Sequence, residues 1–192
     1  MDRIDNIKKV VPYYAVAAVL MFAWIMLIVS GAATPFVSCF AVDASDRIYV
    51  GTDGCIRVYE EGEMVNSFSA QTSKEYMFTI NEHQEIMLAS STTIYHMDLD
   101  GTVLQTKEEP GSDLFYQSQC IRKTFTSANG DEYQLRGQLG WTRIVKNQTE
   151  TVYQISGLSY GVKWMIGLSF ILMLTATVFL FRQEGNKKAA GL

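Results

Sequence analysis

The residue types that most often carry out chemistry are sparse in this sequence and stand apart from one another. Three cysteines, at positions 39, 55 and 120, include no CxxC pair, and His83 and His96 belong to no HExxH or similarly spaced metal motif. Serine and acidic residues are common, yet no glycine-rich phosphate loop brings them together. The sequence therefore predicts no catalytic residue, no cofactor and no metal site.

Two acidic patterns leave alternatives to that prediction. Residues 98–101 read Asp-Leu-Asp-Gly and offer two oxygen ligands for calcium, but the other ligands of an EF-hand loop are missing. Because Asp-Gly is a strong hairpin signal, we interpret this run as a turn. Dispersed carboxylates such as Glu82, Glu85 and Asp113 leave an extracytoplasmic hydrolase as a remote alternative.

Two apolar blocks near the ends of the chain must position whatever lies between them. Residues 10–33 carry no charge, and residues 162–181 carry only Lys163, which can extend its ammonium toward the interface beside Trp164. A helix of about 20 such residues crosses the hydrocarbon core of a bilayer. The sequence therefore predicts transmembrane helices at residues 10–33 and 161–181.

Charge beside these blocks predicts their orientation. The tails, residues 1–9 and 182–192, each hold three Lys or Arg, whereas residues 34–160 hold seventeen Asp plus Glu against nine Lys plus Arg, a net charge of −8. Since Lys and Arg close to a span stay in the cytoplasm, we expect both termini inside and residues 34–160 outside, most simply at the plasma membrane. The alternative is a cleaved signal peptide ending near Ser30-Gly31-Ala32.

The middle segment, residues 34–160, has the alternation and turn signals of short strands, and it repeats. Four apolar positions recur without gaps at displacements of 38 and then 47, keeping the internal spacing of 8, 2 and 6. The three sets are Phe40, Ile48, Val50 and Ile56; Phe78, Ile86, Leu88 and Ile94; and Phe125, Tyr133, Leu135 and Trp141. A fourth strand follows each set, at about residues 64–69, 103–108 and 151–156, and residues 109–120 form an insertion.

The first repeat, residues 40–59, resembles a blade of the NHL and YVTN propeller families, with Arg47-Ile48-Tyr49-Val50 followed by the Asp53-Gly54 turn. The resemblance implies an all-β extracytoplasmic domain of three four-stranded, blade-like repeats, open or incomplete, and a binding scaffold. A plain β-meander or sandwich is the alternative. Three blades are fewer than the four or more of closed propellers, so we expect open edges that recruit a partner.

Three small features complete the candidate residues. Cys39 and Cys55 fall in neighbouring predicted strands outside the cell, so they are a possible disulfide, with three buried thiols as the alternative. Gly157 and Gly161 form a GxxxG pair that allows helices to pack closely or serves as a hinge. Asn147-Gln148-Thr149 matches a glycosylation acceptor and equally fits a turn.

These features favour a non-enzymatic, membrane-anchored protein-interaction module, an accessory or assembly subunit of a membrane complex. Its partners would be the lipid bilayer and either a second protein or another copy of the chain. The acidic middle segment excludes nucleic acid, because phosphate binding needs clustered cations. A ligand-sensing or channel-like two-helix subunit is the alternative, although polar pore-lining residues are scarce.

Overall fold

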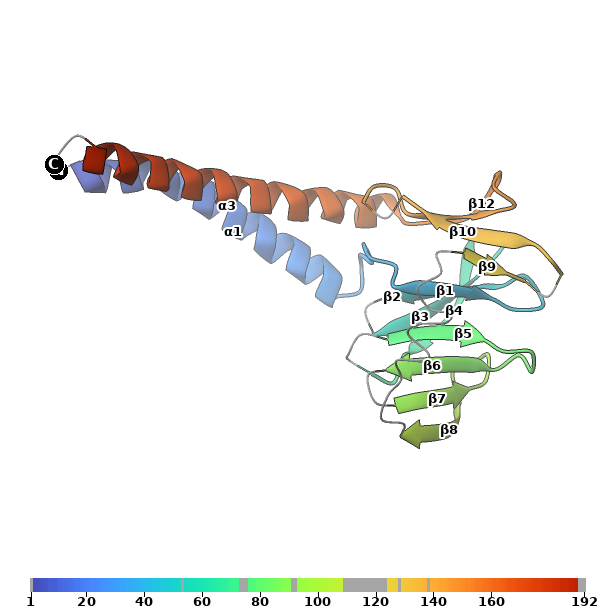
Figure 1. Cartoon of the computed structure of the whole chain (residues 1–192). Coiled ribbons are helices and arrows are strands. Elements are labelled where there is room, and N and C mark those ends of the chain that lie inside the picture. The colour runs from blue at the N-terminus through green and yellow to red at the C-terminus, as the bar shows by residue number, and fades with distance from the viewer. Residues whose placement is uncertain are drawn as a thin grey trace. The chain divides into compact units, whose positions relative to one another are not determined.

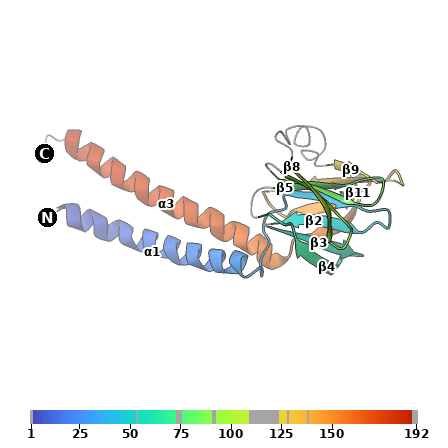
Figure 2. The same cartoon turned by 90° about the horizontal axis from the view of Figure 1, so that it is seen from below.

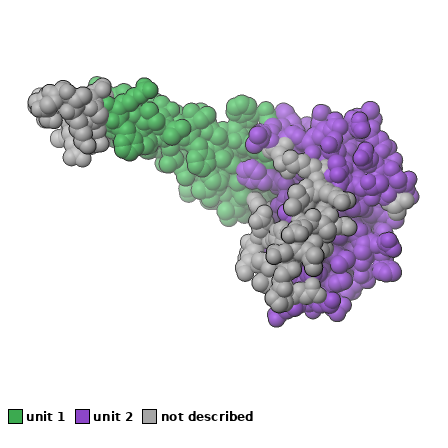
Figure 3. Space-filling view, viewed as in Figure 1, with its two compact units in different colours: residues 1–35, 156–192 green, residues 36–155 purple. Residues whose placement is uncertain are grey.

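A computed structural model describes residues 2–52, 54–72, 76–90, 93–108, 124–127, 129–137 and 139–189, with side chains described from residue 8 to residue 182 of these ranges. The chain divides into two compact units, residues 1–35 with 156–192 and residues 36–155 (Figure 3). The first unit holds the two apolar helices and the second holds the strands.

The helical unit consists of α1, Asp2–Val29, and α3, Gly157–Ala189. Both helices are long and apolar enough to cross a membrane, over Lys8–Val29 (22 residues) and Gly157–Arg182 (26 residues). Helix α1 begins earlier than the apolar block, so Pro12 lies inside it rather than in its first turn. The helix ends at Val29, where Gly31 adopts a left-handed φ of 71° and donates its N–H to the carbonyl of Ile28.

The two helices run antiparallel and side by side, with both chain termini at one end of the pair (Figures 1 and 2). Small and β-branched side chains line their contact, because these allow the backbones to approach closely. The buried ones are Val10, Ala17, Val162, Ser169 and Ala176. A hydrogen bond connects the two helical segments toward each end of the pair. The Tyr14 and Thr177 hydroxyls are 3.0 Å apart, and the Thr34 N–H donates to Ser159 Oγ at 2.9 Å.

The strand unit contains three four-stranded antiparallel sheets, each built from strands consecutive in sequence. Sheet A comprises β1 (Cys39–Val42), β2 (Ile48–Thr52), β3 (Cys55–Glu60) and β4 (Glu63–Ser69). Sheet B comprises β5 (Tyr76–Ile80), β6 (Ile86–Ser90), β7 (Thr93–Met97) and β8 (Val103–Glu108). Sheet C comprises β9 (Thr124–Thr126), β10 (Glu132–Arg136), β11 (Arg143–Lys146) and β12 (Glu150–Gln154). Three open four-stranded repeats are thus compatible with the predicted blade-like units, and the insertion at 109–120 lies outside the described residues.

Sheet A lies between the other two, so the order in space is C, A, B (Figure 1). One face of sheet A packs on sheet B through a cluster that includes Tyr49, Ile56, Phe78 and Leu88. The opposite face packs on sheet C, where Phe40 meets Phe125 (ring centroids 6.5 Å apart) and Tyr59 meets Tyr153 (4.8 Å). The third repeat in sequence therefore neighbours the first rather than the second.

Strand register confirms the repeat between sheets A and B. Phe40 pairs with Val50 as Phe78 pairs with Leu88, and Gly51 pairs with Ile56 as Ala89 pairs with Ile94, a displacement of 38. The set of four apolar positions is therefore structurally equivalent in these two sheets.

The predicted displacement of 47 for sheet C is wrong by one residue. The first ladder pair after the turn is Val42 with Ile48 in sheet A and Thr126 with Glu132 in sheet C, so the displacement from sheet B is 46. A shift of one residue moves a side chain to the other face of a sheet. Tyr133 and Leu135 therefore occupy the face that Tyr49 and Gly51 occupy in sheet A.

A longer connection between β10 and β11, residues 137–142 against residues 53–54 in sheet A, separately removes Trp141 from the core. The residue that pairs as Ile56 does is Ile144, which is 0% exposed and pairs with Leu135. Trp141 lies in the loop between β10 and β11 and is 43% exposed.

Candidate functional site

The same five-residue turn joins the first two strands of every sheet. It spans residues 43–47, 81–85 and 127–131, and in each case the first N–H donates to the fifth carbonyl (2.9–3.1 Å) and the fourth N–H to the first carbonyl (3.0–3.2 Å). The fourth residue has a left-handed φ each time: 62° at Asp46, 59° at Gln84 and 86° at Gly130. This turn is a structural repeat more regular than the apolar positions.

In sheets A and B, the first residue of the turn holds it closed with its side chain, whereas the Ser127 hydroxyl in sheet C has no hydrogen-bond partner among the described residues. Asp43 is 2% exposed, and its carboxylate accepts the N–H groups of Ser45 and Arg47 (both 2.9 Å) and Nε of Arg47 (2.7 Å). That bond raises the pKa of Arg47. Asn81 acts similarly in sheet B, since its Oδ1 accepts the N–H groups of His83 and Glu85 (both 2.9 Å).

The acidic run at residues 98–101 forms the β7–β8 turn, as the hairpin interpretation predicts. Oδ1 of Asp98 accepts the N–H groups of Asp100 at 3.1 Å and Thr102 at 2.7 Å, and Gly101 has a φ of 89°. The carboxylate that was a calcium candidate is engaged by its own turn.

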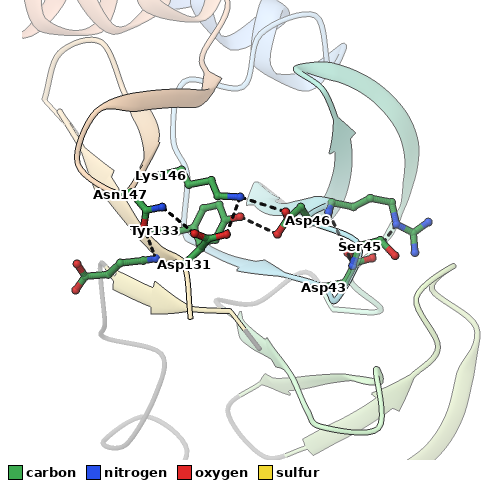
Figure 4. A network of polar contacts seen from close by, with 9 residues as sticks. Asp43, Ser45, Asp46, Asp131, Tyr133, Lys146 and Asn147 are labelled. Carbon is green, nitrogen blue, oxygen red and sulfur yellow. Dashed lines mark hydrogen bonds and ion pairs between the residues drawn. The ribbon is translucent and has the colours of Figure 1, made fainter. Parts of the chain in front are cut away.

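The fourth residue of the turn connects each sheet to the preceding one in space. In sheet A, Asp46 accepts the Tyr133 hydroxyl at 3.0 Å and the Lys146 ammonium at 3.1 Å, both from sheet C (Figure 4). In sheet B, Gln84 Oε1 accepts the Ala44 N–H of the sheet A turn at 2.8 Å. Sheet C has Gly130 at this position, and no described sheet precedes it.

Lys146 is the centre of the contact between sheets A and C. Its ammonium lies 3.1 Å from Asp46 and 2.8 Å from Asp131, and 5.5 Å from the centre of the Tyr133 ring. Asn147 donates to Asp131 at 2.7 Å and accepts the Glu132 N–H at 2.9 Å. These carboxylates raise the pKa of Lys146, and the bonds from Lys146 and Asn147 lower the pKa of Asp131.

A cleft of about 560 Å³ opens beside this network, between the two sheets. The β1–β2 turn, the β3–β4 hairpin and the start of β12 form its walls, and its floor includes Ile48 and Tyr133. Among the described residues, the carboxylates of Glu60, Glu61 and Glu150 line it without an ion pair, and Lys146 is its one cation. The cleft is open, polar and acidic, which suits recognition of a surface rather than chemistry on an enclosed substrate.

In the part of the chain that the structure describes, the chemistry-bearing side chains lie apart from one another. Within the described ranges, no three His, Cys, Asp or Glu side chains are placed to hold a metal ion. His83 is exposed, and His96 Nδ1 lies 3.9 Å from Glu85 with no third ligand-type group beside them. Asp113 and Cys120 lie outside the described residues.

Cys39 and Cys55 are both thiols in the structure. Cys39 pairs with Gly51 and Cys55 with Thr52, so their side chains project from opposite faces of sheet A. Their disulfide stays a prediction, although β1 and β3 are not neighbours as expected: β2 lies between them, so a change of register alone would not bring the two thiols within bonding distance.

Gly157 and Gly161 lie at the start of α3. A Cβ built on either would meet nothing within 4 Å among the described residues, so neither glycine is needed for the contact with α1. Packing of this pair against another copy of the chain stays a prediction.

Sequence reasoning missed the inter-sheet contacts of Asp46, Tyr133 and Lys146. The sequence does contain a signal for them. When the repeats are aligned on their turns instead of their apolar residues, Tyr133 becomes equivalent to Tyr49, and Asn129-Gly130 becomes equivalent to Ser45-Asp46. The partners of Asp46 lie 87 and 100 residues away, and only the order of the sheets brings them together.

No protein-family model matches the chain, and no curated protein does. Similar solved structures include a protein of unknown function from Bacteroides caccae, with 14% identity, a TM-score of 0.33, and coverage of 62% of this chain and 45% of that one. The WD40 domain of Neurospora crassa Pan2 has 16% identity, a TM-score of 0.33, and coverage of 62% and 38%. The chain thus spans less than half the length of either, and likenesses this low carry no functional argument.

Proposed function

We propose that this chain is a non-enzymatic, membrane-anchored protein-interaction module, an accessory or assembly subunit of a membrane complex. In this proposal α1 and α3 cross the plasma membrane, both termini are cytoplasmic, and residues 34–160 form an outward, open propeller-like arc. The excess of Lys and Arg in the two tails and the net charge of −8 in residues 34–160 support this orientation.

The observation that carries the proposal is the exposed outer strand of sheet B. All six residues of β8 are exposed, and they include two apolar ones, Val103 at 37% and Leu104 at 56%. Strand β4 at the equivalent edge of sheet A exposes Met64 and Val65. An open edge strand with apolar side chains is a template for a strand or surface of another chain.

Site-specific photocrosslinking in native membranes tests this proposal. A photoreactive amino acid at Leu104 is expected to give an adduct of discrete mass that contains a second protein chain. The matched control is Glu82, which is exposed in the β5–β6 turn rather than at a strand edge and should give none. Leu104→Lys should abolish an adduct formed from a photoreactive residue at Val103, whereas Thr106→Lys on the same strand should leave it.

The opposite result is equally definite. If gently solubilised membranes return only the monomer and no edge position forms an adduct, the interaction proposal fails. Cysteine-accessibility mapping tests the anchoring separately, because a cysteine introduced at Glu82 should react with an impermeant reagent from outside the cell and one introduced at Asp5 should not.

A further inference from the structure

A groove runs between α1 and α3 near the end of the pair that carries both chain termini. It has a volume of about 350 Å³ and is lined by Lys9, Val10, Tyr13, Thr175, Ala176 and Phe179. All of these residues belong to one compact unit. A volume of this size falls at the lower end of the range for small-molecule sites.

The groove has an apolar floor and aromatic walls. Val10 and Ala176 form the floor and are only 3% and 2% exposed, because they also lie in the helix contact. Tyr13 and Phe179 also line the groove and are 47% and 40% exposed. The Thr175 hydroxyl donates to the Ile171 carbonyl at 2.8 Å, so it presents its methyl group rather than an unsatisfied donor.

A single cation stands at the polar end of this groove. Lys9 is exposed, and it forms no ion pair with the side chains that the structure describes. It is the second residue of the apolar span Lys8–Val29, the depth at which hydrocarbon gives way to headgroups. The groove therefore combines an alkyl-lined channel with a positive charge at headgroup level.

We infer that this groove is a binding site for an anionic phospholipid, with one acyl chain on the Val10–Ala176 floor and the phosphate at the Lys9 ammonium. Basic pockets between membrane helices on the cytoplasmic side bind anionic headgroups by this combination of charge and apolar contact. The two tails add three positive charges more than negative ones in sequence, which favours an anionic over a zwitterionic lipid. The inference depends on the anchoring in the proposed function and not on the protein partner.

Lipid retention by the full-length chain tests the site. The protein is reconstituted into vesicles of equal parts phosphatidylcholine and phosphatidylglycerol, extracted gently, and the lipids that stay bound are counted by native mass spectrometry. Phosphatidylglycerol should be enriched. Lys9→Gln should lower this enrichment about fivefold, as expected for loss of one cation near an anionic surface. Lys163→Gln, at the opposite end of the span, should leave it unchanged.

A second variant separates the groove from general surface charge. Thr175→Phe fills the groove without altering any charge and should abolish retention while the helices still insert. Equal retention of the two lipids, equal effects of Lys9→Gln and Lys163→Gln, or full enrichment in Thr175→Phe would each overturn the lipid site. A crosslink at Tyr13 to α3 of a second copy would also overturn it, since a helix would then occupy the groove. A chain that fails to enter vesicles would instead refute the anchoring.

Discussion

Sheets A and C share a turn and a strand order, yet they bury different faces. Sheet A is covered on both faces, so all five residues of β2 are buried, Ile48 and Val50 toward sheet C and Tyr49 toward sheet B. In β10 of sheet C, Tyr133 and Leu135 are buried against sheet A, whereas Glu132, Gln134 and Arg136 alternate with them on the other face. The difference comes from position in the stack, because no described sheet packs on the polar face of sheet C.

The comparison shows how neighbours, rather than strand propensity, set the sequence of each repeat. A strand whose two faces are both covered has a continuous run of apolar residues, and a strand covered on one face alternates apolar and polar residues. The polar face of sheet C resembles the outer face of a capping repeat in a stacked protein, which ends the stack in water. Sheet C can therefore be the third repeat in the sequence and still lie at the end of the stack beside sheet A.

The strongest test exchanges equivalent residues of the two sheets. Val50 and Gln134 occupy the same position relative to the turn, but Val50 is 0% exposed and Gln134 is half-buried beside Arg136. Val50→Gln should lower the free energy of unfolding by about 4 kcal/mol, because apolar burial is lost and an amide enters the core without partners.

The reciprocal change, Gln134→Val, should alter the free energy of unfolding by less than about 1 kcal/mol. Urea unfolding of the detergent-solubilised chain measures both variants. Similar losses for the two would show that the outer face of sheet C is covered as completely as that of sheet A.

A second test addresses the register of sheet C. Ile144 is fully buried at the position of Ile56, so Ile144→Ala should cost about 3 kcal/mol through lost contacts and a cavity. Trp141→Ala should cost less than about 1 kcal/mol, although the side chain removed is larger, because it is partly exposed in a loop. The reverse ranking would place Trp141 rather than Ile144 at the core position of the third repeat.

Much of the fold follows from the sequence, and the missing part has a physical cause. Long uncharged blocks predict α1 and α3, Asp-Gly and Glu-Gly signals predict the hairpins, and the first two repeats predict each other. Glu61 and Gly62, for example, adopt the two left-handed conformations, φ 49° and 84°, that a two-residue hairpin turn requires. Local chemistry of this kind is readable from neighbouring residues alone.

The order of the sheets and the contacts of Lys146 were not predictable in this way. The apolar pattern assumes that each repeat buries the same face, and sheet C breaks that assumption because its neighbour lies on the other side. Lys146 stands where sheet A has Val58, since both pair with the tyrosine of the second strand. A lysine at a position that is buried and apolar in sheet A makes the third repeat look weak in the sequence, because the sequence does not show its two carboxylate partners, Asp46 and Asp131.

The turn residue that connects the sheets gives a smaller, sharper test. Gly130 has a φ of 86° and no sheet to contact among the described residues, so Gly130→Asp should cost about 1 kcal/mol in backbone strain that no new bond offsets. Asp46→Gly should cost less, because the relief of strain at a φ of 62° opposes the loss of the bonds to Tyr133 and Lys146. Thermal unfolding compares the two, and a stabilised Gly130→Asp would indicate an undetected partner for that turn.

The smallest change in stability is expected for the Lys146→Gln variant, and this change depends on pH. Hydrogen bonds from Lys146 and Asn147 lower the pKa of Asp131 in the folded chain, so this carboxylate adds stability above its unfolded pKa. That contribution is lost as pH falls through the lower, folded pKa, and Lys146→Gln should raise the pKa of Asp131 toward its value in the unfolded chain. At neutral pH the loss of stability in this variant should be the smallest among these substitutions, because water screens a partly exposed ion pair. Carboxyl ¹³C titration measures the pKa of Asp131 directly, with Asn147→Ala as the control. If this pKa changes only in Asn147→Ala, Lys146 interacts mainly with Asp46 of sheet A and not with Asp131 of sheet C.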